Sequence, residues 1–199
     1  PPVSAQCPTR WWTVEVYDPA SGTFATTPIR LERRSHYLSP EQAVVLADGR
    51  VLFVDGVFVA IIDPVAGQAS AGASAGVFDP GASLRCKRVG TPIRLADGRV
   101  FIPCTGGLAG AIFAADGSSV ETVAGAQGWD DAAPLPDGRV LVVASDGRAG
   151  VFDPATTTFE RVGQLGAWDY LPISARPRLT PLEDGRVLIT GGITPGGDR

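Results

Sequence analysis

Short apolar runs that follow an Asp-Gly pair recur four times along the chain. The four copies are LADGRVLFVDG at 46–56, LADGRVFIPCTGG at 95–107, LPDGRVLVVASDG at 135–147 and LEDGRVLITGG at 182–192. Their leading leucines are 49, 40 and 47 residues apart. A period of this length with strand-like segments is typical of a propeller or of another array of repeated sheets.

Each copy predicts two strands joined by a tight turn. The Asp-Gly pair is expected to supply the two positive-φ positions of a type I′ hairpin turn. An arginine follows each pair and begins the second strand, at Arg50, Arg99, Arg139 and Arg186. The apolar run after it, as in Val140-Leu141-Val142-Val143, favours a strand that is buried on both faces.

A second motif alternates with the first one. It is VEVYDPASGTF at 14–24, AGVFDPGAS at 75–83, AGVFDPATTTF at 149–159 and a degenerate GAIFAADGSSV at 110–120. Each copy predicts a third strand, a turn begun by proline and a more polar fourth strand. One repeat is therefore a four-stranded antiparallel meander, the unit of a propeller blade. The stretch 58–74 has no counterpart, and we interpret it as a long loop or a decayed strand pair.

The whole chain, 1–199, is expected to form one all-β domain of four blades. Blades one to three are predicted at 38–90, 91–128 and 129–166, and the fourth combines 177–199 with 11–31. Strand pairing between 185–192 and about 11–31 would close the ring and cover the edge strands. Two alternatives stay open, a fragment of a six- or seven-bladed propeller and a strand-swapped dimer.

These motifs resemble the bacterial kelch repeat, as found in the propeller of galactose-oxidase-like proteins. The resemblance rests on the DGRV(L/F) strand pair, on the Gly-Gly pairs at 106–107 and 191–192, and on the third-strand motif. Two copies depart from the Gly-Gly pattern, at Asp55-Gly56 and at Ser145-Asp146-Gly147. The resemblance implies a propeller but no particular activity, because the family includes enzymes, binding proteins and scaffolds. Copper-radical chemistry needs two histidine ligands, and the chain has one histidine, so no copper is expected.

Composition excludes some functions. The net charge is −4 without any basic stripe, which argues against nucleic-acid binding, and no apolar run is long enough to span a membrane. The sequence has no methionine and begins PPVSAQ, so we expect a processed or excised chain. A removed signal peptide would make the protein secreted or periplasmic. Cys7, Cys86 and Cys104 allow at most one disulfide within the chain, and the sequence leaves their state open.

The function is expected at the end of the sheets that carries the 2–3 and 4–1 loops, because these loops vary in length and content. There, aromatic rings mixed with acids and arginines suit a glycan, a small polar ligand or a protein. Alternatively, the tryptophans only fill the space between blades. The predicted ligand-binding residues are Trp11, Tyr37, Trp129, Asp130, Asp131, Trp168, Asp169, Tyr170, Arg176 and Arg178.

Three functional hypotheses remain from the sequence. The first is a kelch-like binding or interaction module. The second is a small enzyme with an acid–base site at the channel mouth, and its candidate catalytic residues are His36, Glu41, Asp130 and Asp131. The third is a structural fragment or swapped oligomer without a ligand. No cofactor or metal site is predicted, although Glu41, Asp130, Asp131 and Asp169 are also suited to bind Ca²⁺.

Overall fold

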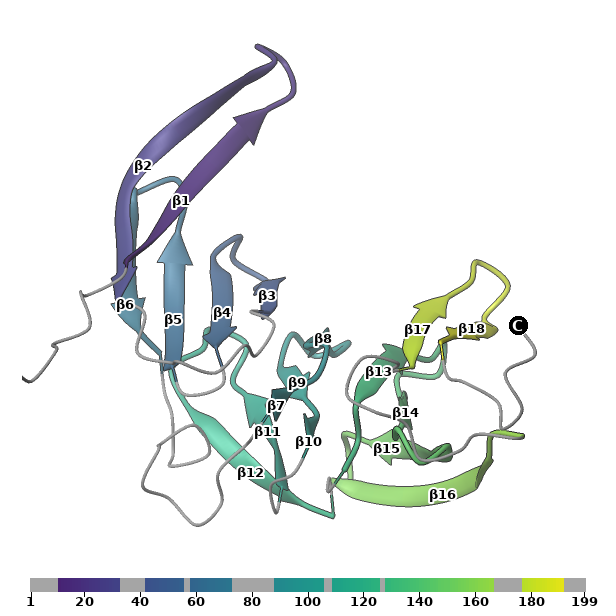
Figure 1. Ribbon diagram of the computed structural model, residues 1–199. Coiled ribbons are helices and arrows are strands. Elements are labelled where there is room, and N and C mark those ends of the chain that lie inside the picture. Colours follow the sequence, from purple (N-terminus) through teal and green to yellow (C-terminus); the bar gives the residue numbers. More distant parts are fainter. Residues whose placement is uncertain are drawn as a thin grey trace, which may run out of the picture.

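The computed structural model shows strands and turns throughout its described residues, and none of these residues is helical (Figure 1). It describes residues 11–32, 42–55, 58–72, 88–105, 109–125, 128–166 and 177–191. The prediction of an all-β chain built from small antiparallel sheets is therefore confirmed. No described segment forms a helix that is long and apolar enough to cross a membrane.

Three sheets of four strands follow one another along an open arc (Figure 1). Each is an antiparallel meander in chain order, which matches the predicted repeat. Sheet 1 contains β3 (Gln42–Val45), β4 (Val51–Asp55), β5 (Phe58–Asp63) and β6 (Gln68–Ala71). Sheet 2 contains β8 (Ile93–Arg94), β9 (Val100–Ile102), β11 (Ala109–Phe113) and β12 (Val120–Ala124). Sheet 3 contains β13 (Asp131–Pro134), β14 (Val140–Val143), β15 (Arg148–Asp153) and β16 (Thr158–Gln164).

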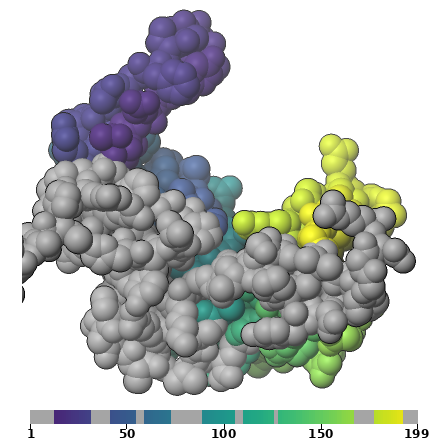
Figure 2. Space-filling view, in the orientation of Figure 1, coloured from purple at the N-terminus to yellow at the C-terminus, as the bar shows by residue number. Residues whose placement is uncertain are grey.

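Two hairpins lie at opposite ends of this arc. The N-terminal hairpin pairs β1 (Trp11–Asp18) with β2 (Thr23–Glu32), and the C-terminal hairpin pairs β17 (Arg178–Pro181) with β18 (Val187–Thr190). They stand apart in the space-filling view of Figure 2. A short pair of strands, β7 (Arg88–Val89) and β10 (Cys104–Thr105), adjoins sheet 2.

The predicted ring closure, with 185–192 paired to about 11–31, is absent from the described strands. Each hairpin is a sheet of two strands. The physical reason is that each one packs on a different neighbour: Ile29 and Leu31 of β2 bury their side chains with Ala60 and Ile62 of sheet 1. At the other end of the arc, β17 contacts β13. A four-bladed closed ring is thus not confirmed.

The DGR turns have a different geometry from the predicted type I′ turn. The Gly49 N–H donates to the Leu46 carbonyl at 3.2 Å, and the Leu46 N–H donates to the Arg50 carbonyl at 2.7 Å. Only the glycine has a positive φ, 87° at Gly49, and the aspartate before it does not. This is a three-residue loop, a type I turn followed by a glycine in a bulge. The turns at 95–99, 135–139 and 182–186 repeat these hydrogen bonds.

The stretch 58–74, interpreted above as a loop or a decayed strand pair, supplies the third and fourth strands of sheet 1. β5 ends at Asp63, a turn follows, and β6 begins at Gln68. The sequence Ile62-Asp63-Pro64 is a copy of the third-strand motif that the sequence comparison missed. It was missed because GVFDPG, within 75–83, resembles that motif more closely; 75–83 lies outside the described residues.

Apolar side chains fill the spaces between successive sheets. Leu52 and Ile61 of sheet 1 pack with Val100 and Phe113 of sheet 2. Phe101 of sheet 2 stacks on Phe152 of sheet 3, with ring centroids 4.5 Å apart. Inner apolar runs are therefore covered on both faces, whereas the outermost strands β6 and β16 are mostly exposed. This stacking holds the DGR turns of neighbouring sheets side by side, at the same end of each sheet.

Candidate functional site

Each DGR turn neutralises its own charge. In the first copy, Asp48 accepts the Arg50 backbone N–H at 3.0 Å and the Arg50 Nε–H at 2.7 Å. The same two contacts recur at 97–99, 137–139 and 184–186. Hydrogen bonds from Arg139 hold the pKa of Asp137 below its ordinary value of 3.8, so this carboxylate is charged at neutral pH.

A fifth copy of this turn lies at the opposite end of sheet 3, where Ser145-Asp146-Gly147-Arg148 connects β14 to β15. The Gly147 N–H donates to the Ala144 carbonyl, and Asp146 accepts the Arg148 Nε–H at 2.6 Å. From the sequence, these residues are a departure from Gly-Gly in a 2–3 connection, and the turn itself is not predicted. The letters DGR at 146–148 were the signal that could have identified the turn.

Two DGR arginines also connect neighbouring sheets. A second nitrogen of Arg50 donates to the Asp116 carbonyl of sheet 2 at 3.0 Å. In the same way, Arg99 donates to the Pro154 carbonyl of sheet 3 at 3.0 Å. Each acceptor lies in the turn between the third and fourth strands of the next sheet. The arginine therefore fixes the spacing of successive sheets at this end.

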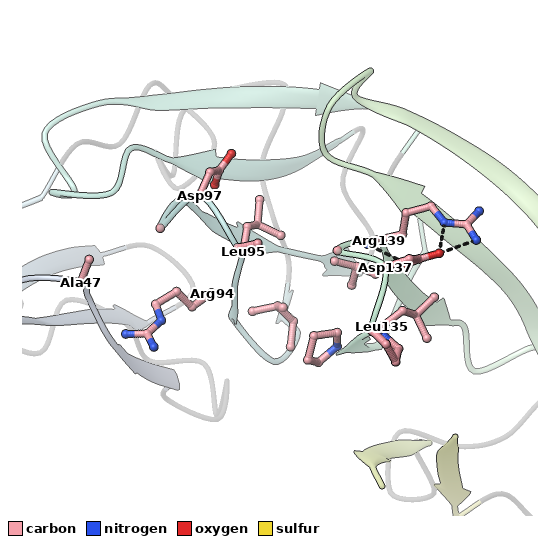
Figure 3. A pocket seen from close by; sticks show the side chains of 14 residues that line it. Ala47, Arg94, Leu95, Asp97, Leu135, Asp137 and Arg139 are labelled. Atoms are coloured by element: carbon pink, nitrogen blue, oxygen red, sulfur yellow. Dashed lines mark hydrogen bonds and ion pairs between the residues drawn. The ribbon is translucent and has the colours of Figure 1, made fainter. Parts of the chain in front are cut away.

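A cavity of about 850 Å³ lies at this end, between the DGR turns of sheets 2 and 3. Figure 3 shows Arg94, Leu95 and Asp97 of sheet 2 on its walls, with Leu135, Asp137 and Arg139 of sheet 3 across from them. Arg99 pairs with Asp97, and Arg139 pairs with Asp137, both at 2.7 Å. Among the described residues that line the cavity, Arg94 is therefore the charged side chain without an ion-pair partner, and its guanidinium extends toward the side of Ala47 of sheet 1 (Figure 3).

Arg94 stands out when the repeats are compared strand by strand. It pairs with Val100 in β9, and the equivalent positions in the other inner strands are Val45, Pro134 and Pro181. A charged side chain thus replaces an apolar one at a single copy of this position. Arg94 is exposed and has no ion pair with any other described residue. The sequence comparison missed it, although aligning the residue before each leading leucine would have revealed it.

Trp129, a predicted ligand-binding residue, is buried between sheets 2 and 3. It is 5% exposed, and its ring stacks on Phe159 at 6.1 Å with an interplanar angle of 15°. The Arg148 guanidinium lies 5.3 Å from the centroid of the indole ring. This position agrees with the alternative interpretation, in which tryptophan fills the space between blades.

Asp130 and Asp131, the predicted binding and catalytic acids, are also buried, and their carboxylates tie strands together. Asp130 accepts the Thr105 hydroxyl at 3.0 Å and the Ser145 backbone N–H at 2.6 Å. Asp131 accepts the Leu179 N–H at 2.8 Å and so attaches the C-terminal hairpin to sheet 3. The second carboxylate oxygen of Asp131 and the indole N–H of Trp129 have no hydrogen-bond partner among the described residues.

The other predicted site residues are placed only in part. Arg178 is exposed on β17, and only the backbone of Trp11 is described, in β1. Cys104 is disulfide-bonded. Within the ranges that the structure describes, no three metal-binding side chains gather at one point, and the Ca²⁺ expectation stays a prediction. Residues outside the described ranges are His36, Tyr37, Glu41, Trp168, Asp169, Tyr170, Arg176, Cys7 and Cys86.

Solved structures with a similar fold are propeller-like proteins. A streptogramin B lyase is 14% identical to this chain, with a TM-score of 0.63. The similarity covers 94% of this chain and 60% of the lyase. YCF48 bound to D1 peptide is 13% identical with a TM-score of 0.53, and 85% of this chain covers 52% of it. An auxiliary nutrient binding protein from Bacteroides thetaiotaomicron is 12% identical with a TM-score of 0.56, and 75% of this chain covers 35% of it.

These similarities support a propeller fold, and at such low identity they extend to the fold alone. The chain spans about half of the length of the first two proteins and less of the third. No family model matches the sequence, and no curated protein matches it either. The expected membership of the kelch family or of the galactose-oxidase-like proteins is therefore not confirmed.

Proposed function

We propose that the protein is a propeller-type binding module and that its site is the cavity between the DGR turns of sheets 2 and 3. The observation that carries the proposal is Arg94, an exposed cation that lines the cavity and has no ion pair with any described residue, whereas Asp97 and Asp137 are each neutralised by an arginine. A guanidinium in this setting binds a carboxylate through two parallel hydrogen bonds. The ligand class is a small molecule or peptide that carries a carboxylate.

The walls of the cavity support this assignment. Pro134 and Leu135 offer apolar surface to a ligand, whereas Ile93 and Leu95 line the cavity but are almost fully buried in the core. A concave site that combines some apolar surface with a few directed polar groups is typical for small ligands. The site also lies on strands and turns that the inter-sheet hydrogen bonds of Arg50 and Arg99 hold in place, so little ordering is needed on binding.

The proposal places the site at the opposite end of the sheets from the end predicted by the sequence. Most of the residues predicted there lie outside the described ranges, and Trp129, Asp130 and Asp131 are buried in contacts between strands. The glycan-binding hypothesis at that end stays a prediction, as does the acid–base enzyme hypothesis built on His36 and Glu41. Similar proteins that bind ligands, among them YCF48 with a peptide, support a binding role in general.

A secreted or periplasmic location is part of this proposal. The disulfide bond of Cys104 supports it, because such bonds persist in oxidising compartments and are rare in the cytosol. A module in such a compartment would meet free peptides and small carboxylates as ligands.

The test uses a set of tetrapeptides with free C-terminal carboxylates and the same peptides as C-terminal amides. We expect NMR titration to show the acids shifting resonances of the cavity residues more strongly than the amides. Arg94→Gln should weaken binding by about tenfold or more, because a charge-assisted hydrogen bond is lost. Arg30→Gln, an exposed arginine on β2 outside the cavity, is the matched control and should leave the affinity unchanged. Equal binding of acids and amides, or no effect of Arg94→Gln, would contradict the proposal.

A further inference from the structure

A fixed register joins the second and third strands in every complete sheet. The valine that follows DGR pairs with the residue that precedes the turn to the fourth strand. The three pairs are Val51 with Ile62, Val100 with Phe113 and Val140 with Phe152. The hairpins carry the two halves of this pair separately: Val187 follows DGR in β18, and Tyr17 precedes Asp18-Pro19 in β1.

Burial shows that the hairpin residues lack the neighbours that their equivalents have. Phe113 and Phe152 are 0% exposed, whereas Tyr17 is 52% exposed. The local geometry is nevertheless the same, because Tyr17 packs on Phe24 at 4.9 Å as Phe152 packs on Phe159 at 4.7 Å. The N-terminal hairpin is thus formed like the outer half of a complete sheet, but its inner edge is uncovered by any described strand.

The C-terminal hairpin shows the complementary gap. Leu188 is 49% exposed, while at the equivalent register positions Leu52 and Phe101 are fully buried and Leu141 is partly buried. Moreover, Arg139 of sheet 3 contacts its own Asp137, but no carbonyl of a following sheet among the described residues, unlike Arg50 and Arg99. The turn that would supply such a carbonyl is of the kind at Asp18–Gly22 in the N-terminal hairpin.

We propose that β18 of one chain pairs with β1 of a second copy of this chain, so that two hairpins form one four-stranded sheet. The repeat register places Val187 opposite the partner copy's Tyr17 and Leu188 opposite its Val16. In that position Arg139 donates to the carbonyl of Pro19 in the docked hairpin. The pairing covers exposed apolar side chains and satisfies the backbone groups of two open strand edges.

A second copy fits better than the chain's own hairpin, because the two hairpins lie at opposite ends of the arc and each is already packed on its own sheet (Figure 1). A head-to-tail contact that repeats twice closes into a two-fold ring.

The experiment mixes two variants of the full chain that each add one cysteine to the three native ones, Val16→Cys and Leu188→Cys, under mild oxidation. We expect a covalent species with twice the mass of the 20.6 kDa chain, whose linked peptides contain residues 16 and 188. A mixture of Thr13→Cys with Leu188→Cys is the out-of-register control and should link at least about tenfold less, since the cysteines are three residues out of step.

Three results would overturn the proposal. One is a link that forms only within single chains of the double variant Val16→Cys/Leu188→Cys, which would mean that each chain closes on itself. Another is a control mixture that links as well as the test mixture. The last is the formation of long polymers by the double variant in place of a two-chain species, which would exclude a closed ring.

Discussion

The three complete sheets and the two hairpins are built from one repeat, yet equivalent side chains have different surroundings in them. Phe152 of sheet 3 is 0% exposed and Tyr17 of the N-terminal hairpin is 52% exposed, although both lie just before the same kind of turn. Strand sequence and turn geometry are alike in the two regions. The difference shows that the local repeat forms each hairpin, while burial depends on the strand and sheet beside it.

The largest difference is expected when these two aromatic residues are truncated. Phe152→Ala removes a ring that packs on Phe101 and Phe159, and it should lower the free energy of unfolding by about 3–5 kcal/mol. Tyr17→Ala should cost less than about 1 kcal/mol when the chains are separate, because half of this side chain already faces water. Chemical denaturation of both variants at low protein concentration measures the comparison, and equal losses would contradict it.

A smaller effect is expected inside sheet 3 when a methyl group is added to a glycine. A Cβ at Gly150 would lie 2.9 Å from the Trp129 ring and 3.1 Å from the Glu160 carbonyl. Gly150→Ala should therefore displace the indole and cost about 1–3 kcal/mol in thermal unfolding. Gly163→Ala in the neighbouring strand is the control, since nothing lies within 4 Å of its added Cβ. If both variants kept the native midpoint, Trp129 would not be packed between the sheets as described.

A local effect is expected where the C-terminal hairpin joins sheet 3. Asp131→Ala removes the acceptor of the Leu179 N–H, which should speed hydrogen exchange at that amide by about tenfold, or about 1.4 kcal/mol. Asp131→Asn keeps an acceptor oxygen and should restore most of the protection. Exchange rates in sheet 2 serve as the internal reference. Loss of protection throughout the molecule would show that Asp131 supports the whole fold and not this joint alone.

The smallest effect concerns the turn that both regions share. Hydrogen bonds from Arg139 and Arg186 lower the pKa of Asp137 and of Asp184 below 3.8. Because each aspartate has a lower pKa in the folded chain than its unfolded pKa of about 3.8, its ionised form stabilises the folded state at pH values above about 3.8. This contribution is lost as the pH falls through the pKa of the folded state. The urea midpoint should stay level above about pH 4 and decline below it.

The two aspartates should behave alike in this acid titration. Asp137→Asn and Asp184→Asn should each make the acid decline shallower by a similar small amount, because their turns have the same hydrogen bonds. Urea titrations at several pH values measure this. A large effect in sheet 3 and none in the hairpin would mean that the shared turn contributes only where a sheet is complete.

The sequence predicted the repeated meander and the positions of the DGR turns, because these depend on local residues. The predicted turn type was wrong, because an Asp-Gly pair occurs in several kinds of hairpin loop. In the structure the Leu46 N–H donates to the Arg50 carbonyl, and this hydrogen bond closes a three-residue loop. The sequence-based prediction also missed β5 and β6, because two Asp-Pro motifs, at 63–64 and 79–80, compete within one repeat. Ring closure depends on how hairpins pack on distant sheets, which a repeat pattern does not specify.

The candidate site was harder to predict than the fold. Polar residues such as Asp130 suggested a binding surface, yet its carboxylate accepts hydrogen bonds from Thr105 and Ser145. Side-chain type alone does not reveal such partners, which lie 25 and 15 residues away in the sequence. Arg94 was recognisable only by comparing one register position across all repeats, where the other copies are apolar.

The central claim is that the hairpins are half-sheets that complete each other between two chains. Native mass spectrometry of the unmodified protein tests it most directly. The account predicts a species of twice the 20.6 kDa chain mass. Leu188→Arg should convert this species to single chains, because it places a charge between the paired strands β18 and β1. A single-chain mass for the unmodified protein across the micromolar range would contradict it.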